Sequence, residues 1–141
     1  MSETELIQIY LAAPLFSKAE QDFNAQLGQA LQEKGYQVFL PQKECNGKQG
    51  EAIYHTCLNG LRAAKVVVAI LDGADADSGT CWEFGYAVGQ GIPAIAVRTD
   101  FRVSGDTQGF NAMLYYSAAK VVDSPDDYLE KILNALQSLG F

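Results

Sequence analysis

The densest cluster of reactive side chains lies on a short loop and at the start of a predicted helix, residues 80–90. Its members are the carboxylates Asp72, Asp75, Asp77 and Glu83. An ionised carboxylate can attack carbon as a nucleophile or accept hydrogen bonds from a sugar hydroxyl. Glu83 falls in the first turn of the predicted helix, where the helix dipole favours the ionised form that a nucleophile requires.

The same residues also have purely structural interpretations. Thr80 and Glu83 are spaced as a capping box, in which the glutamate only holds the start of the helix. Aspartates are common turn formers, so loop formation alone accounts for the others. Spacing leaves both interpretations open.

The sequence lacks the signatures of most cofactor-dependent chemistry. Residues 12–17 read AAPLFS, with neither the G-x-G-x-x-G of dinucleotide-binding folds nor a phosphate-binding GxxxxGK[ST] loop. The three cysteines, Cys45, Cys57 and Cys81, show no C-x-x-C spacing. The single histidine, His55, cannot build a metal site alone. We therefore expect reduced thiols and neither a metal nor an organic cofactor.

Charge and hydropathy narrow the possible partners. The net charge is −7, from 10 Lys+Arg against 17 Asp+Glu, and no basic cluster is present to bind DNA or RNA. No apolar run approaches the roughly 20 residues that a membrane helix needs. The acidic residues 1–5 lack the basic region of a signal peptide. We expect a cytoplasmic protein that binds a small neutral ligand.

Alternating strand and helix patterns predict the fold that positions these residues. Strands are predicted at residues 6–12, 37–40, 66–71, 92–97 and 120–122. Helices are predicted at residues 17–34, 49–65, 80–90 and 126–139. We predict a single α/β domain, residues 1–141, with a flavodoxin-like three-layer open sheet of about five parallel strands and helices on both faces.

A sheet of this kind also predicts where a ligand binds. Ligands lie beyond the carboxyl ends of the strands, where the strand order reverses. The residues that follow Leu11 and Leu71 are therefore the expected site. Tyr10, close to the first of these points, is either a site residue or a core aromatic, since aromatics are common in strands.

The carboxylate cluster belongs to a longer pattern. Residues 72–87 read DG-x3-DSGT-x2-E-x-G-x-A, which resembles the signature of nucleoside 2-deoxyribosyltransferases. Four other segments are similar to elements of that family in the same order: IYLAAPLF at 9–16, FLPQ at 39–42, RTDFR at 98–102 and the N-x-M of 111–113. The resemblance covers about residues 7–122.

The resemblance implies roles for residues of the catalytic centre. Glu83 is implied as the nucleophile, with Tyr10 hydrogen-bonded to it and positioning it. Asp77 is implied as a ligand of a sugar hydroxyl. Ser78 and Gly79 of the DSGT segment are further implied substrate-binding residues.

The resemblance also implies contacts with the nucleobase and with a second subunit. Gln42 would meet the base, with Phe16 packed beside it. Asn111 and Met113 would come from a neighbouring subunit, which implies a homo-oligomer, a dimer or larger. The apolar run at residues 113–116, MLYY, is typical of a flat subunit interface, although a core strand looks similar.

One position departs from the family pattern. Many relatives carry an aspartate that faces the base in a D-L-x-x-L run, whereas residues 57–61 read CLNGL and place Cys57 there. A thiol, with a free pKa of about 8.5, is a poor acid at neutral pH. Three candidates then remain for protonating the leaving base: Asp72, water and His55, which is otherwise a helix-surface residue.

The implied reaction transfers a 2-deoxyribosyl group from a deoxynucleoside to a free nucleobase. Glu83 would bond to the anomeric carbon and be displaced by the second base, so that two displacements retain the configuration. The closest alternative is an N-glycosidase of 2-deoxynucleoside 5′-monophosphates, although Asp77 and Asn111 suit a free hydroxyl better than a phosphate. A more distant alternative is a non-enzymatic nucleoside-binding module in which Glu83 is only a helix cap.

Overall fold

The computed structural model describes residues 6–103 and 107–141. The prediction of an N-terminus without a signal peptide concerns residues 1–5, which lie outside the described residues. The sequence also predicts a loop at residues 99–110, and Gly105 of that loop lies outside the described residues as well. No helix in the described ranges is long and apolar enough to cross a membrane.

The strands form one parallel sheet, as predicted. In chain order they are β1 (Gln8–Ala12), β2 (Gln37–Phe39), β3 (Val66–Ile70), β4 (Ala94–Arg98) and β5 (Lys120–Asp123). Their order in the sheet is β2-β1-β3-β4-β5, so the chain reverses its direction of travel across the sheet between β1 and β3. This is the flavodoxin-like topology that the sequence predicts.

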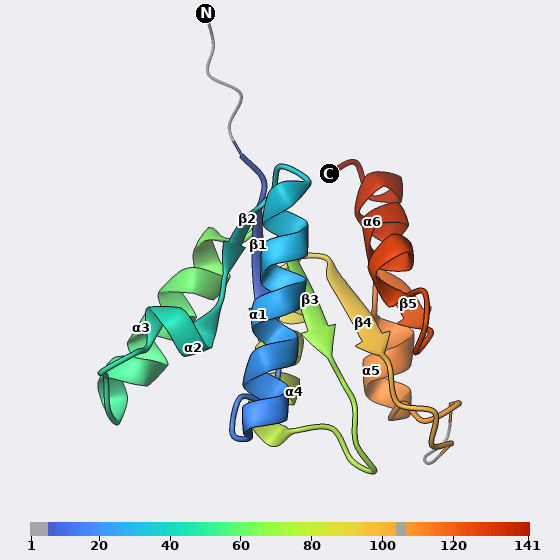
Figure 1. Cartoon of the computed structure of the whole chain (residues 1–141), viewed down its shortest axis with the longest axis horizontal. Helices are drawn as coiled ribbons and strands as arrows, with labels where there is room; N and C mark the ends of the chain where they lie inside the picture. The colour runs from blue at the N-terminus through green and yellow to red at the C-terminus, as the bar shows by residue number, and fades with distance from the viewer. Residues whose placement is uncertain (1–5, 104–106) are drawn as a thin grey trace, which may run out of the picture.

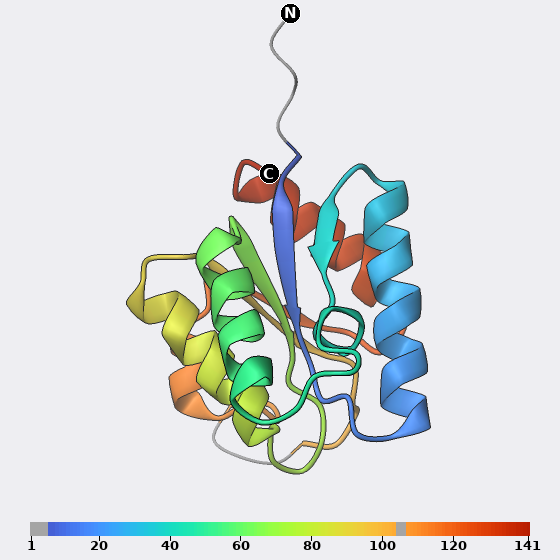
Figure 2. The same ribbon diagram turned by 90° about the vertical axis from the view of Figure 1, so that its left-hand side faces the viewer.

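Helices cover both faces of the sheet and complete three layers (Figures 1 and 2). The helices are α1 (Lys18–Glu33), α2 (Pro41–Glu44), α3 (Glu51–Ala63), α4 (Ser78–Gly89), α5 (Ala112–Ser117) and α6 (Tyr128–Ser138). Residues of α1 and α6 pack in one apolar core, and residues of α3, α4 and α5 pack in the other.

Alternation along β1 divides its side chains between these two cores. Ile9 and Leu11 pack on the side of α1 and α6, whereas Tyr10 and Ala12 pack on the side of α3 and α4. Successive side chains of a strand point to opposite faces, so the position of Tyr10 follows directly from the pattern of the strand. All four residues are fully buried.

Two short helices are absent from the prediction. The sequence predicts Pro41 only as the end of a strand, but it begins the single turn α2, where its missing N–H has no partner to lose. The core-strand alternative for the apolar run at residues 113–116 is wrong, because α5 is a helix. Its start is capped by Asn111, whose Oδ1 accepts a hydrogen bond from the Met113 amide at 2.8 Å.

Helix α4 begins two residues earlier than predicted. Its N-cap is Asp77, whose Oδ2 accepts hydrogen bonds from the backbone N–H and the hydroxyl of Thr80, both at 2.9 Å. The capping box between Thr80 and Glu83 is therefore wrong, because Asp77 already satisfies the amide that needs a cap. Glu83 lies in the second turn of α4, and its carboxylate is not used to hold the helix end.

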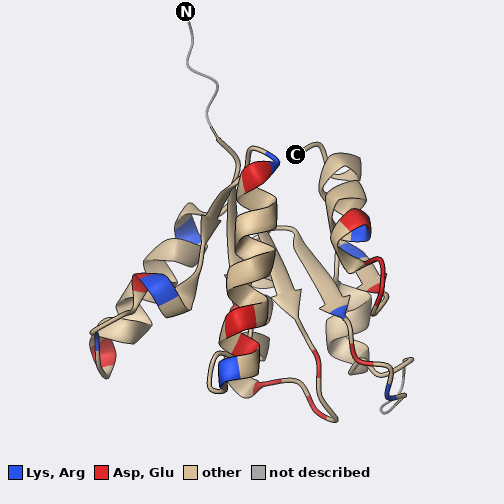
Figure 3. Cartoon of the chain, viewed as in Figure 1, with Lys and Arg blue, Asp and Glu red and all other residues tan. Residues whose placement is uncertain are grey.

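The strands β3 and β4 point towards the lower edge of the molecule in Figure 1, opposite the C-terminus. The loops that follow these strands lie at this edge. Figure 3 marks acidic residues along the loop after β3 and on the first turns of α1. This edge is the expected ligand end of the sheet.

Candidate active site

A cavity of about 350 Å³ opens at this edge, on the face of the sheet that α3 and α4 cover. We call it the Glu83 cavity. Its walls come from the loop after β1, from α2, α3 and from the start of α4: Ala13, Leu15, Phe16, Pro41, Ile53, Tyr54, Cys57, Leu58, Asp77, Gly79, Trp82 and Glu83. Two carboxylates and one thiol thus stand in a mostly apolar and aromatic wall.

The side chain of Tyr10 links β1 to α4 through Glu83. Its hydroxyl donates a hydrogen bond to Oε2 of Glu83, 73 residues further along the chain. The Tyr10 ring is stacked on Phe39 of β2, with ring centroids 5.0 Å apart and an interplanar angle of 12°. Gly60 permits this packing, because a Cβ there would lie 2.6 Å from Cε2 of Phe39. The hydroxyl is therefore aimed by a fixed ring.

The surroundings of Glu83 disfavour its charge. Burial raises the pKa of the Glu83 carboxyl to about 7, the hydrogen bond from Tyr10 acts in the opposite direction, and the charge of Asp77 raises the pKa further. The predicted stabilisation of the ionised form by the helix terminus does not prevail. A carboxyl poised near neutral pH in a cavity is typical of a reactive group. Burial, followed by the charge of Glu83, raises the pKa of Tyr10 above its usual range, so Tyr10 stays a donor.

Asp77 and Gly79 lie where the resemblance places substrate-binding residues. Asp77 lines the Glu83 cavity, and Thr80 occupies only its Oδ2. Its Oδ1 has no protein partner within the described residues and is free to accept a hydroxyl. Gly79 also lines the cavity, whereas Ser78 is an exposed first residue of α4 outside the lining.

The two predicted base contacts differ. Phe16 lines the Glu83 cavity and is 77% exposed, so one side of its ring is free to meet a ligand. Gln42 instead fastens α2 to α1: its Nε2 donates to the carbonyl of Gln21 at 2.9 Å, and its Oε1 accepts from Asn24 at 3.2 Å. Phe16 and Glu83 therefore line the same cavity, whereas Gln42 lies outside the cavity lining.

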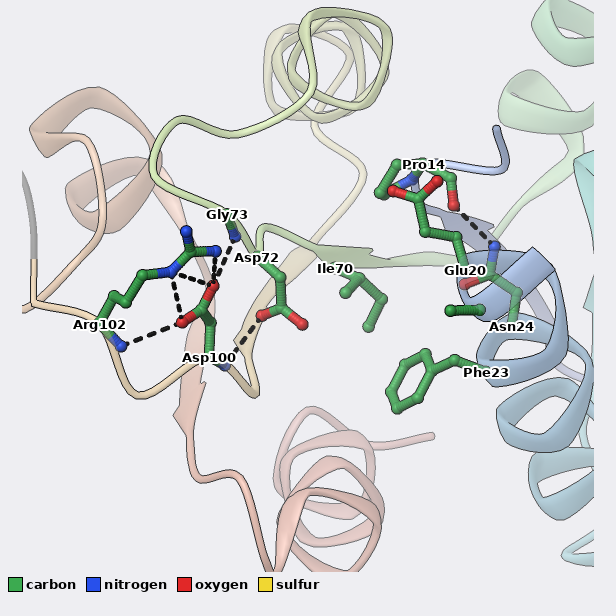
Figure 4. Close-up of a pocket in the computed structure, with 10 residues that line it drawn as sticks. Pro14, Glu20, Phe23, Asn24, Ile70, Asp72, Gly73, Asp100 and Arg102 are labelled. Carbon is green, nitrogen blue, oxygen red and sulfur yellow. Dashed lines mark hydrogen bonds and ion pairs between the residues drawn. The ribbon is translucent and has the colours of Figure 1, made fainter. Parts of the chain in front are cut away.

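Asp72 lies in a different cavity, on the opposite face of the sheet (Figure 4). We call it the Asp72 cavity. It measures about 320 Å³ and is lined by Pro14, Ala19, Glu20, Phe23, Asn24, Ile70, Asp72, Gly73, Asp100 and Arg102. The Asp72 carboxylate accepts hydrogen bonds from the N–H and hydroxyl of Thr99 at 2.6 and 2.5 Å, and from the Asp100 N–H at 3.2 Å. The structure therefore separates Asp72 from Glu83.

The other candidate acids also differ in position. His55 is exposed on α3, pairs with Glu51 at 3.1 Å and lies outside the cavity lining. Cys57 lines the Glu83 cavity, where burial raises the pKa of its thiol to about 11. Its thiol therefore stays protonated at neutral pH and is a poor acid for a leaving base.

The segment that the resemblance assigns to a neighbouring subunit faces outward. Asn111 is exposed, and the side chain of Met113 is 78% exposed. Within the described part of the chain, neither residue lines the Glu83 cavity of its own subunit. Helix α5 packs beside α4, so this exposed face adjoins the helix that carries Glu83.

Arg98 is a positioning residue that the sequence reasoning did not identify. Its side chain is 1% exposed and donates from Nη1 to the carbonyls of Leu71 and Gly73, at 3.0 and 2.9 Å. Its Nη2 donates to the carbonyl of Arg102 at 2.9 Å. Arg98 thus ties the loop after β3 to the loop after β4. The available signal was an arginine at the end of an otherwise apolar strand.

No group of three or more His, Cys, Asp or Glu side chains in the described ranges is arranged to hold a metal ion. The polar groups gathered around the Glu83 cavity are the carboxylate of Glu83, the hydroxyl of Tyr10 and the Oδ1 of Asp77. A nucleophilic carboxylate, a group that aims it and a hydroxyl acceptor suit reaction at a sugar carbon.

Comparisons with solved structures find proteins of similar fold. A conserved protein from Enterococcus faecalis V583 is 28% identical, with a TM-score of 0.75 over 92% of this chain and 99% of that chain. The 2-deoxyribosyltransferase from Bacillus psychrosaccharolyticus is 21% identical, with a TM-score of 0.73 over 85% of this chain and 88% of that chain. The CMP N-glycosidase of Clostridium botulinum is 17% identical, with a TM-score of 0.65 over 90% of this chain and 98% of that chain.

The last two likenesses are remote in sequence and show the fold alone. No curated protein sequence matches this chain. The family described as Nucleoside 2-deoxyribosyltransferase matches residues 9–120, a span that contains Tyr10, Asp77, Glu83 and Asn111. Because this match covers most of the chain, the protein belongs to the nucleoside 2-deoxyribosyltransferase family.

Proposed function

We propose that the protein transfers a 2-deoxyribosyl group between nucleobases through a covalent intermediate on Glu83. The observation that carries this proposal is the Tyr10–Glu83 hydrogen bond in the wall of a cavity that also contains Asp77. A glutamate that is partly buried, aimed by a hydroxyl and poised near neutral pH is arranged for reaction rather than for holding a helix.

The reaction proceeds in two displacements. Ionised Glu83 bonds to the anomeric carbon as the bond between that carbon and the base breaks, and the base leaves with the electron pair. A free base then attacks the same carbon through a ring nitrogen and releases Glu83, and the proton of that nitrogen passes to the hydroxide left when water protonated the first base. The two displacements together retain the original configuration. Tyr10 keeps one carboxylate oxygen hydrogen-bonded and so leaves the other to react.

The departing base takes its proton from water in this proposal. Asp72 is committed to Thr99 and Asp100 on the other face of the sheet, and His55 lies outside the cavity. Cys57 lies in the cavity, but its raised pKa makes it a poor acid. The Glu83 cavity is open to solvent beside the exposed Phe16, which gives water a route to the base.

Asp77 supports a deoxynucleoside rather than a 5′-monophosphate as the substrate. Its free Oδ1 can accept a hydrogen bond from a sugar hydroxyl. A second negative charge beside it would be repelled, as the effect of Asp77 on the Glu83 pKa illustrates. The N-glycosidase alternative uses the same Glu83 with water as the acceptor, so the two activities differ only in what attacks the intermediate.

The first experiment incubates the protein with thymidine and adenine and separates the products by chromatography. Formation of deoxyadenosine supports transfer, whereas release of free 2-deoxyribose without exchange supports hydrolysis. Thymidine alone should leave a deoxyribosyl mass adduct on the peptide that contains Glu83. Glu51→Gln changes an exposed glutamate outside the cavity and is the matched control. The same assay is repeated with thymidine 5′-monophosphate, the substrate class of the N-glycosidase alternative. If neither thymidine nor its monophosphate gives exchange, hydrolysis or an adduct, the binding-module alternative is favoured.

We also propose that Asn111 and Met113 complete the site of a neighbouring subunit. The support is their exposure beside α4 and their separation from the Glu83 cavity of their own chain. Trp82 on α4 and Tyr116 on α5 are also exposed, at 49% and 76%. Apolar and aromatic residues of this kind are enriched in subunit interfaces.

Subunit mixing tests this arrangement. Glu83→Ala and Asn111→Ser subunits, each nearly inactive alone, should recover activity when mixed, because a mixed interface pairs an intact Glu83 with an intact Asn111. Serine retains an acceptor at the N-cap of α5, so the helix start is preserved. No recovery in verified mixed oligomers would assign Asn111 to its own subunit or to no site.

A further inference from the structure

Two of the three thiols lie side by side. Cys45 follows α2, Cys57 lies within α3, and their Sγ atoms are 3.6 Å apart. Both are free and partly buried. The third thiol, Cys81, contacts the carbonyl of Ala76 at 3.8 Å instead. The proposed reaction uses none of the three.

This pair touches the wall of the Glu83 cavity from two elements. Cys57 lines the cavity on α3, and Pro41, at the start of the turn that Cys45 ends, lines it on α2. The Cys57 thiol also interacts with the hydroxyl of Tyr10, the group that aims Glu83. A covalent bond between Cys45 and Cys57 would therefore link two walls of the cavity. It would also lie beside the Tyr10 hydroxyl, which donates a hydrogen bond to Glu83.

We propose that Cys45 and Cys57 form an oxidation site, at which a hydroperoxide converts the pair to an intramolecular disulfide that switches off the reaction at Glu83. A disulfide needs its sulfur atoms about 2.05 Å apart, so the pair must close by about 1.5 Å from 3.6 Å. Residues 46–50, which follow Cys45, are all exposed, whereas Leu58 and Leu61 anchor α3 in the core. Closure therefore draws Cys45 and the end of α2 towards α3, while Gln42 holds the start of α2 against α1. The space between α2 and α3 narrows as a result.

The oxidation balances as two steps. The Cys45 thiolate attacks one peroxide oxygen, the O–O bond breaks, and an alcohol or water leaves while Cys45 becomes a sulfenic acid. The Cys57 sulfur then attacks the Cys45 sulfur, and the hydroxyl leaves as water with the Cys57 proton. The two thiols lose two electrons, and the peroxide gains them. We assign the first attack to Cys45 because burial raises the pKa of Cys57 to about 11.

The disulfide itself is tested without any assay of activity. The whole protein is treated with hydrogen peroxide, blocked with an alkylating agent and digested without reductant. We expect a peptide pair that joins Cys45 to Cys57, with two thiols lost per chain. Cys81→Ser should form the same linkage, and Cys45→Ser should form none. Thiols that disappear without this linkage, or a linkage that involves Cys81, would overturn the proposal.

The functional consequence rests on the proposed base exchange, and it is measured separately. Oxidised parent should lose about 100-fold in exchange rate, the order of effect that a 1 Å displacement of a reacting group produces, and regain it with dithiothreitol. Cys45→Ser, outside the cavity lining, should match the untreated parent and resist peroxide. Reversible linkage with unchanged turnover would overturn the switch, whereas absence of turnover before oxidation would instead contradict the proposed function.

Discussion

Two cavities with carboxylates open at the same edge of the sheet, and one of them raises the pKa of a carboxyl group to near neutral. The Glu83 cavity lies on the side of α3 and α4, and the Asp72 cavity lies on the side of α1. Both follow the ends of β1 and β3, and both contain acidic residues from the same stretch of sequence. A count of carboxylates does not distinguish them.

The two cavities differ in the number of hydrogen-bond donors that contact a carboxylate. In the Asp72 cavity, Asp100 accepts hydrogen bonds from the Gly73 N–H at 3.0 Å and from the side chain and N–H of Arg102. The side-chain hydrogen bond from Arg102 lowers the pKa of Asp100 below its usual range. Glu83 has Tyr10 as its side-chain donor, and burial raises its pKa to about 7.

The difference illustrates how several donors hold a carboxylate in its charged form, whereas burial opposed by the hydrogen bond from Tyr10 raises the pKa of Glu83. Hydrogen bonds to the charged form stabilise it, and desolvation destabilises it. Substitution of one carboxylate or one donor at a time tests whether hydrogen-bond donors and burial account for the difference between the two cavities.

The largest effect is expected for Glu83→Gln. Loss of a covalent nucleophile can lower turnover by on the order of 10⁶-fold, and base exchange should fall towards the limit of detection. The matched control is Asp100→Asn, the same change in the Asp72 cavity, for which exchange should stay within about tenfold of the parent. Equal losses of exchange rate in Glu83→Gln and Asp100→Asn would contradict a special role for the Glu83 cavity.

The same two variants should change stability in opposite directions at pH 8. The pKa of Glu83 is raised from 4.5 to about 7 in the folded state, so its contribution to stability is present below pH 4.5 and lost as the pH rises through 7. Above pH 7 the folded protein carries the cost of a partly buried charge on Glu83. Glu83→Gln removes this cost and should raise the free energy of unfolding at pH 8 by about 3 kcal/mol at most, with no gain at pH 4.

Asp100 has the reverse dependence. Its pKa is lowered in the folded state, so its contribution is present at neutral pH and lost as the pH falls through the acidic range. Asp100→Asn should therefore unfold at lower denaturant concentration than the parent at pH 8. Urea titrations of both variants at the two pH values measure the signs. Shifts of the same sign at pH 8 would contradict the comparison.

Tyr10→Phe removes the side-chain donor of Glu83 while it keeps the stacked ring. Loss of one aimed donor costs about 10²-fold in rate, so exchange should slow while the fold is retained. The parent kcat/KM should rise with pH through about 7 as Glu83 ionises. Because the Tyr10 hydrogen bond lowers the Glu83 pKa, this rise should move to higher pH in the variant. If the pH dependence of kcat/KM is the same in the variant and the parent, Tyr10 serves only in packing.

The smallest effect on the reaction is expected for Asp72→Asn. The amide group cannot accept all three hydrogen bonds from Thr99 and Asp100, so the free energy of unfolding should fall by about 1–2 kcal/mol. The value of kcat should change little, because Asp72 lies outside the Glu83 cavity. A fall in kcat of about 10²-fold or more would instead support Asp72 as the acid that protonates the leaving base.

Local patterns in the sequence determined the sheet and the side chains available to it. The strand predicted at residues 66–71 is an unbroken apolar run, which is typical of a strand covered on both faces. In the structure β3 is buried throughout. Period-two alternation in β1 turned Tyr10 away from Ile9 and Leu11. The spacing around Glu83 indicated the family, which the match over residues 9–120 confirmed.

Local patterns failed where two neighbouring residues competed for one role. Thr80 and Asp77 are both good N-caps, and the backbone that enters α4 selected Asp77. The single-turn α2 and the six-residue α5 are too short to show a helical period. Gln42 has the chemistry of a base contact, but its amide is used by Gln21 and Asn24 of α1.

Only the tertiary structure decided which carboxylate is poised to react. Asp72 and Glu83 are close in sequence, yet the partners of Asp72 are 27 and 28 residues away and the donor to Glu83 is 73 residues away. A pKa depends on burial and on the donors in contact, and both are set by elements that meet only when the chain is folded. The sequence therefore determined that acidic groups stand at this edge of the sheet, and the packing of β1 against α4 made Glu83 the one whose charge is costly.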